Sequence, residues 1–254
     1  MMRADVTKSP YGPLHAILAG AALVSVVIGF PAVKYGWAFV WKEFLYGVKI
    51  APDVKNFALM LASTVVVFGG VAAVAWASTL FTREKRIASG LEVESPEVDR
   101  RGGLKFALRA AAPIAAVTIA ISMLCSAALE KATGVKFADQ PLVDFLRGGG
   151  GTLAAKSLVV LLVVVEAPLF EEPLFRGVVF RGFARAMPMW AAMLLSGFFF
   201  ALVHLNAATF IPLWFIGAAF AWVYWKTGTI LAPMLVHFLF NLLNLCLAFL
   251  FPDM

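Results

Sequence analysis

Long apolar runs, separated by short polar segments, make up most of this chain. A helix needs roughly 20 predominantly apolar residues to cross a bilayer, and a shorter run can still form a buried membrane helix. We expect seven of the runs to be transmembrane helices, and together they predict an all-α polytopic helical bundle: Leu14–Val33, Phe57–Phe81, Phe106–Leu129, Leu153–Phe175 (with helix continuing toward Ala186), Pro188–Leu205, Phe210–Trp225 and Ile230–Phe251.

The composition excludes a soluble globular domain. Of the 254 residues, 62% are hydrophobic and 14% are charged, whereas soluble domains are roughly 45–50% apolar and about 25% charged. The net charge of +6 indicates lysine and arginine in cytoplasmic loops rather than nucleic-acid binding. Cys125 and Cys246 each lie inside an apolar run, which argues against a thiolate zinc site and gives no indication of a disulfide.

The segments between the spans predict the organisation of the chain. Lys34–Lys55 mixes aromatic residues with lysines, as interfacial segments do, and Thr82–Lys105 is rich in lysine and arginine, which predicts a cytoplasmic loop. Glu130–Gly151 is a loop that ends in four glycines. We expect residues 1–151 to hold spans one to three and residues 152–254 to hold a core of spans four to seven, in one integral membrane unit. The expected location is the bacterial inner membrane, with a cytoplasmic N-terminus.

A cluster of ionisable residues interrupts the fourth span. Glu166, Glu171, Glu172 and Arg176 lie in or beside it, although an ionisable group in hydrocarbon costs at least a few kcal/mol unless it is paired or functional. Glu172 and Arg176 are spaced i, i+4 on one helix face, about 40° apart, which predicts an ion pair. Glu171 points about 100° away from Glu172 and is free to face a cavity.

Two further features concern the geometry of the helices. Pro168 and Pro173 remove backbone donors and should bend the fourth helix beside the cluster. Gly217 and Ala221 have the small-xxx-small spacing that lets the sixth helix pack closely against a neighbour.

Polar residues recur in the spans that follow. Phe200 and His204 form F-x-x-x-H in the fifth span, and His237 and Asn241 form H-x-x-x-N on one face of the seventh. Each histidine alone is more often a helix-packing group than a catalyst. Together with the intramembrane carboxylates, however, they match the needs of amide hydrolysis. That reaction requires a base beside water and donors aimed at the tetrahedral oxygen.

The three motifs E-E-x-x-x-R, F-x-x-x-H and H-x-x-x-N, in this order, resemble the CPBP family of intramembrane proteases. This family is also called the CAAX-protease and bacteriocin-processing or Abi family, and it includes the type II CAAX prenyl endopeptidases. The resemblance covers about Glu166–Leu243 and implies an intramembrane endopeptidase. It implies that Glu171 and His204 activate a water, that His237 and Asn241 hold the oxyanion, and that Glu172, Arg176 and Phe200 support them.

Metal dependence stays open at this point, because the family is described both as metalloproteases and as glutamate proteases. If zinc is present, its ligands would be Glu171, His204 and His237, a three-ligand set of the catalytic kind. The chain contains no H-E-x-x-H motif. The placement of Asn241 four residues after His237 suits a pair of donors better than a set of ligands.

Other functions compete with proteolysis by this site. A non-catalytic family member would act as a scaffold or immunity protein, and a proton-coupled transporter would use the intramembrane carboxylates and histidines as a relay. A rhomboid-type serine protease would use Ser196, but the expected G-x-S-G is broken by Leu194. The expected partners are the bilayer and a membrane protein or peptide substrate. Prenylated C-termini, sorting tails and leader peptides are all open, and nucleic acid is not expected.

Overall fold

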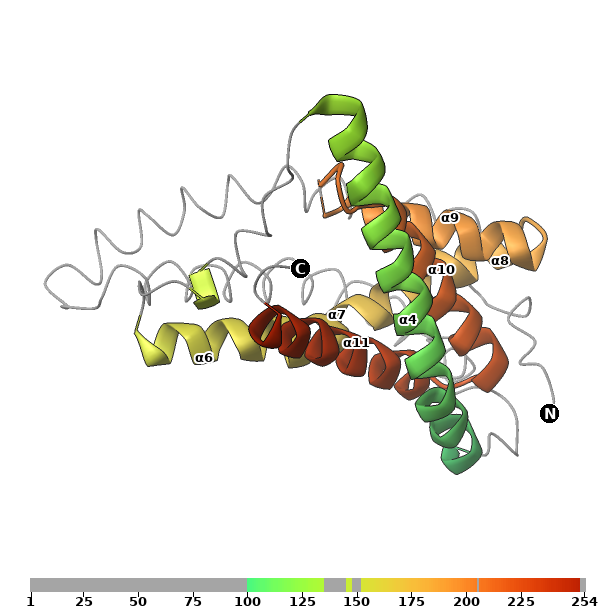
Figure 1. Cartoon of the computed structure of the whole chain (residues 1–254). Helices are drawn as coiled ribbons and strands as arrows, with labels where there is room; N and C mark the ends of the chain where they lie inside the picture. The colour runs from blue at the N-terminus through green and yellow to red at the C-terminus, as the bar shows by residue number, and fades with distance from the viewer. Residues whose placement is uncertain (1–99, 135–144, 148–151, 205, 252–254) are drawn as a thin grey trace, which may run out of the picture.

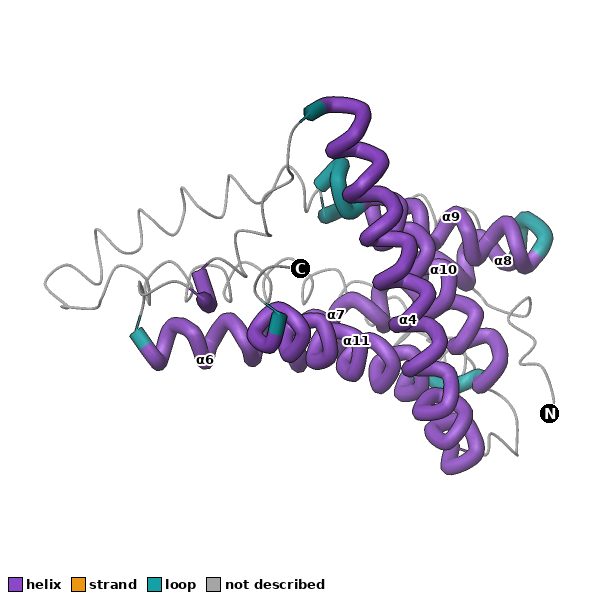
Figure 2. Tube along the Cα trace, viewed as in Figure 1, coloured by secondary structure: helices purple, strands orange, loops and turns teal. Residues whose placement is uncertain are grey.

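The computed structural model describes residues 100–134, 145–147, 152–204 and 206–251. All secondary structure within these ranges is helical, as Figure 2 shows, and the predicted all-α class is thereby confirmed for this part of the chain. The predicted spans Leu14–Val33 and Phe57–Phe81, the segment Lys34–Lys55 and residues 82–99 lie outside the described residues.

The predicted spans from the third onward each correspond to a helix (Figure 1). One long helical stretch carries the charged cluster and consists of five consecutive elements without a break. The bounds are α4 Arg100–Thr133, α6 Leu153–Leu161, η2 Leu162–Glu166, α7 Ala167–Glu172, η3 Pro173–Phe180, α8 Arg181–Ala184, α9 Met189–Leu202, α10 Phe210–Thr227 and α11 Leu231–Leu250.

Three stretches in the described ranges are long and apolar enough to cross a membrane: Gly102–Thr133, Leu153–Ala184 and Leu231–Leu250. Helix α9 is apolar but shorter. These helices support an integral membrane protein, while the predicted number of about seven spans depends on residues outside the described ranges.

The boundaries of α4 correct the sequence-based expectation. The predicted loop Thr82–Lys105 ends too late, because the helix already begins at Arg100. Arginine and lysine are good helix formers, so a helix continues through them where hydropathy alone marks its end. At the other end, α4 runs to Thr133 and stops at Gly134, whose φ of 69° is the left-handed conformation that glycine adopts without strain.

Side chains and glycine also define the ends of α6 and α10. The backbone N–H of Ala155 donates to the Thr152 hydroxyl over 3.2 Å, which caps α6 directly after the glycine run. Helix α10 ends at Gly228 with φ 66°, and the Gly228 N–H donates to the Tyr224 carbonyl over 2.8 Å. The chain therefore turns sharply enough for α11 to start at Leu231.

Helices α4, α9, α10 and α11 pack with η3 around one apolar core. In Figure 1, α4 crosses both α10 and α11. Fully or nearly buried residues from every one of these elements meet in this core: Ala107 and Ile114 of α4, Leu174 and Phe175 of η3, Phe200 of α9, Ile216 and Phe220 of α10, and Val236 of α11. The part of the long stretch that packs into this core is therefore η3, the segment that carries Arg176.

Two glycines allow α9 and α10 to approach closely. A Cβ atom on Gly217 would lie 2.9 Å from the Cα of Gly197, and one on Gly197 would lie 2.5 Å from the Trp214 carbonyl oxygen. Neither position has room for a side chain. The close packing predicted for Gly217 is therefore present, and its partner is Gly197.

Candidate active site

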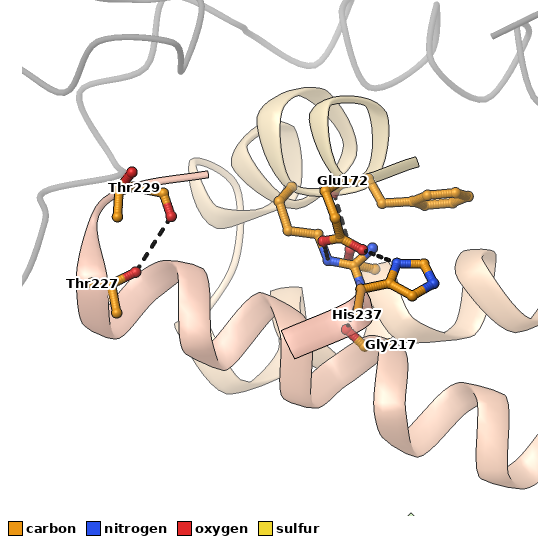
Figure 3. A network of polar contacts seen from close by, with 8 residues as sticks. Glu172, Gly217, Thr227, Thr229 and His237 are labelled. Carbon is orange, nitrogen blue, oxygen red and sulfur yellow. Dashed lines mark hydrogen bonds and ion pairs between the residues drawn. The ribbon is translucent and has the colours of Figure 1, made fainter. Parts of the chain in front are cut away.

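The Glu172–Arg176 ion pair that the i, i+4 spacing predicts is present. Glu172 Oε2 lies 3.0 Å from Arg176 Nε, and neither side chain is exposed. Figure 3 draws the polar contacts around Glu172, with Gly217 and His237 nearby. Arg176 Nη2 also donates to the carbonyl of Gly217 over 3.0 Å. Close packing of the two glycines brings that carbonyl within reach, so α10 takes part in holding the arginine.

Aromatic rings enclose the rest of the guanidinium group. The Arg176 Cζ atom lies 4.9 Å from the ring centroid of Phe200, 5.2 Å from that of Phe220 and 5.7 Å from that of Phe175. Ring faces attract a cation. This buried arginine therefore has a carboxylate, a carbonyl and three rings around it. These contacts offset the free-energy cost of removing the guanidinium group from water.

Glu172 has a second partner on α11. Its Oε1 atom lies 2.9 Å from His237 Nδ1, and the histidine is 4% exposed. The imidazole stacks on Phe220, with ring centroids 4.8 Å apart and an interplanar angle of 26°. The carboxylate of Glu172 therefore bridges Arg176 and His237, and it joins the first motif to the third.

Phe200 connects the second motif to the others. Its carbonyl oxygen lies 2.7 Å from His204 Nδ1. Its ring centroid is 4.9 Å from the His204 ring and 5.8 Å from the His237 ring. The two imidazoles therefore lie against the same phenyl ring. His204 follows the end of α9 by two residues and is exposed, whereas His237 is buried.

Glu171 differs from its neighbour because its buried oxygen has neither a hydrogen-bond partner nor an ion-pair partner among the described residues, whereas the corresponding oxygen of Glu172 is paired with Arg176. The residue is half-buried on α7, and its Oε2 atom is buried without a partner in the described ranges. The Glu171 carboxylate lies within electrostatic range of His237, Glu172 and Arg176. One of the two adjacent glutamates is thus occupied by structural contacts, and the other retains an oxygen that can accept a proton.

Asn241 contacts the helix that carries the glutamates. Its Nδ2 atom donates to the Val163 carbonyl over 2.7 Å. Val163 lies in η2, a π-helix, in which a carbonyl pairs with the N–H five residues later. That position is Pro168, which has no N–H. Asn241 therefore satisfies a carbonyl that the proline leaves free, and one hydrogen of its amide group remains available.

The two prolines distort the helix by widening its turns. Pro168 follows the π-helical segment η2 by two residues, and Pro173 begins the π-helical segment η3. Such insertions are frequent at functional sites. The predicted distortion beside the cluster thus consists of two π-helical segments.

Glu166 is a further buried carboxylate, at the end of η2. It is 7% exposed, and neither of its oxygens has a hydrogen-bond partner in the part of the chain described here. Glu166 is therefore a buried carboxylate with no pairing residue in these ranges.

The candidate site residues are not arranged as the ligands of a metal ion. Within the described ranges, no three histidine, cysteine, aspartate or glutamate side chains are arranged so that they could hold one ion. This applies to the set of Glu171, His204 and His237 considered for zinc.

Ser196 has a packing role in this structure. Its side chain is fully buried, and its hydroxyl donates to the Phe175 carbonyl over 3.2 Å. The hydrogen bond joins α9 to η3. The serine is therefore engaged in helix packing and presents no exposed hydroxyl.

Comparison with protein families is consistent with this arrangement. Residues 153–243 match the family model described as Rce1-like, type II CAAX prenyl endopeptidase. The matched range begins at the first residue of α6 and ends within α11, so it includes all three motifs. No curated protein and no solved structure matches the chain.

Proposed function

We propose that this protein is an intramembrane endopeptidase, because residues 153–243 match the model of an Rce1-like protease family. It hydrolyses a peptide bond of a membrane-associated protein or peptide. The candidate substrates are CAAX-like C-terminal segments, sorting tails and leader peptides.

The observation that carries this proposal is the buried bridge of Glu172 between Arg176 and His237. Residues of the first and third motifs, far apart in sequence, make one hydrogen-bonded unit there. Phe200 adds the second motif, because its carbonyl contacts His204 and its ring contacts both imidazoles. Such convergence of separate motifs on one place supports a common chemical task.

In the proposed mechanism, Glu171 and His204 activate a water molecule. Glu171 has a carboxylate oxygen without a partner, so it can accept a proton from water as the hydroxide forms a bond to the substrate carbonyl carbon. The tetrahedral oxyanion receives hydrogen bonds from His237 and Asn241. When the C–N bond breaks, the proton taken from water passes to the leaving amine.

The remaining motif residues hold these groups in place. Glu172 and Arg176 fix His237, and Phe200 fixes His204. Asn241 keeps one amide hydrogen for the oxyanion while the other is bound to Val163.

The experiment compares membrane proteomes, with protein termini mapped, among cells that carry wild type, Glu171→Ala or Glu166→Gln. Glu166 is a matched control, because it is a buried carboxylate of the same helical stretch outside the proposed machinery. We expect new termini in wild-type and Glu166→Gln cells and their absence in Glu171→Ala cells. Identical termini in all three, at equal protein levels, would favour the non-catalytic scaffold instead.

A further inference from the structure

We propose that Glu172 and the Phe200 carbonyl fix one tautomer, with the proton on Nδ1, in His237 and His204 respectively. Both imidazoles then present Nε2 to the reaction. The catalytic meaning of this inference rests on the proposed function, but the position of the protons is a property of the resting protein and is measurable without a substrate.

The assignment for His204 follows from the chemistry of its partner. The Nδ1 atom lies 2.7 Å from the Phe200 carbonyl oxygen. A carbonyl oxygen only accepts hydrogen bonds, so Nδ1 must carry the hydrogen. In a neutral imidazole the other nitrogen then has a lone pair. The Nε2 atom of His204 is therefore the one that can accept a proton.

The assignment for His237 follows from the ion pair. Glu172 Oε2 lies 3.0 Å from Arg176 Nε, and both side chains are fully buried. A buried guanidinium keeps its charge and needs an anion beside it, so we assign the ionised form to Glu172. An ionised carboxylate only accepts. Its Oε1 atom, 2.9 Å from His237 Nδ1, therefore receives the Nδ1 hydrogen.

No other described group around His237 competes for that hydrogen. Phe220 of α10 and Phe200 of α9 present rings to the imidazole. The charged groups that face the site are Glu171, Glu172 and Arg176, all on α7 and η3. Among these three charged groups, Glu172 alone contacts Nδ1 of His237 within hydrogen-bond distance.

The same tautomer gives the two histidines different tasks, because their partners differ in charge. His204 faces a neutral carbonyl, so its unprotonated Nε2 suits proton transfer. His237 donates from Nε2 only when it carries a second proton, and a buried positive charge needs an anion beside it. The carboxylate of Glu172 is that anion. Glu172 is thus a positioning residue that acts through His237.

The test is 15N NMR of histidine-labelled protein in bilayers, because protonated and unprotonated ring nitrogens have well-separated shifts. The chain contains only three histidines, so His204→Gln and His237→Gln each assign one set of signals. We expect a protonated Nδ1 in both residues of the wild type. A His237 or His204 protonated on Nε2 alone would overturn the inference.

A pair of variants then tests whether Glu172 is responsible. In Glu172→Gln the amide can either accept from or donate to Nδ1, so we expect two sets of His237 signals and an unchanged His204. In Glu166→Gln both histidines should match wild type. An unchanged His237 in Glu172→Gln would refute the role of Glu172. If this variant does not accumulate, the wild-type spectrum still decides the tautomer.

The result is independent of the proteolysis experiment. If no new termini appear but Nδ1 is protonated in both histidines, the proposed function is contradicted and the tautomer assignment stands. If new termini appear but a histidine is protonated on Nε2 alone, proteolysis stands and the tautomer assignment is wrong.

Discussion

At the scale of single residues, adjacent glutamates have different environments. Glu172 is fully buried and uses both oxygens, one with Arg176 and one with His237. Glu171 is half-buried and has an oxygen without a partner. Successive helical residues point about 100° apart. One carboxylate of the pair can therefore make buried contacts with Arg176 and His237, while the next faces a different direction and keeps a free oxygen.

This difference predicts opposite consequences for the same substitution. Glu172→Gln removes the charge that compensates a fully buried arginine, and breaking a buried pair costs about 3–5 kcal/mol. We expect a low yield of folded protein and a lower midpoint of thermal unfolding in detergent. Glu171→Gln keeps the shape of the side chain and removes only the proposed base, so that variant should accumulate normally and generate no new termini.

Glu166→Gln serves as the control in both measurements, with normal yield and normal activity expected. Equal yields and equal residual activities for Glu171→Gln and Glu172→Gln would contradict the division of roles between the two residues.

At the scale of elements, the site depends on how closely α9 and α10 approach. Gly197 and Gly217 bring the two helices together, and the Gly217 carbonyl then receives a hydrogen bond from Arg176. Phe200, one turn after Gly197 on α9, reaches Arg176 and both imidazoles. The distance between α9 and α10 therefore affects the positions of Arg176, His204 and His237.

Gly197→Ala should disturb this arrangement. Its Cβ would lie 2.5 Å from the Trp214 carbonyl oxygen and 2.6 Å from the Ala218 backbone nitrogen, and backbone atoms do not move aside as a flexible side chain does. Overpacking of this kind typically costs 1–3 kcal/mol. We expect a lower thermal midpoint and reduced turnover, measured on purified protein in detergent and by the appearance of new termini.

Gly103→Ala is the matched control for that change. Its nearest neighbour would be the Thr229 Cγ2 atom at 3.2 Å, which belongs to a side chain. A smaller loss of stability and unchanged turnover are expected. A Gly197→Ala variant as stable and active as Gly103→Ala would mean that the close contact does not support the site.

At the scale of the whole molecule, basic residues gather where several helices begin or end. Gly103, at the start of α4, lies beside Thr227 and Thr229, which follow Lys226 at the end of α10. Ala184, the last residue of α8, belongs to the same buried cluster as Tyr224 of α10. The basic start of α4 and the basic end of α8 therefore each lie near the C-terminal part of α10, which by the positive-inside rule predicts that this end of the bundle is cytoplasmic.

Cysteine labelling tests this topology. In a background with Cys125 and Cys246 replaced by alanine, cysteine introduced at Ser89 or at Lys226 should resist membrane-impermeant maleimide in intact cells. Both should react after permeabilisation, which controls for accessibility. Ready labelling of either position in intact cells would place this end of the bundle on the opposite side of the membrane.

Features that depend on spacing along one helix were predictable from the sequence. The hydropathy of the apolar runs anticipated α4, α9, α10, α11 and the long stretch from α6 to α8, with errors of a few residues at the ends. Backbone groups in lipid must be satisfied within the segment, so length and hydropathy suffice to predict a helix. The i, i+4 rule predicted the Glu172–Arg176 pair for the same local reason.

Contacts between helices were decided by the tertiary structure alone. The hydrogen bond from His237 to Glu172 joins residues 65 positions apart, and the hydrogen bond from Asn241 to Val163 joins residues 78 apart. Helical periodicity specifies the face on which a side chain lies, but the rotation and depth of one helix against another come from packing of small residues and rings. Sequence could therefore nominate the residues of the site, whereas only the packed helices determined that Glu172, rather than Glu171, contacts the histidine.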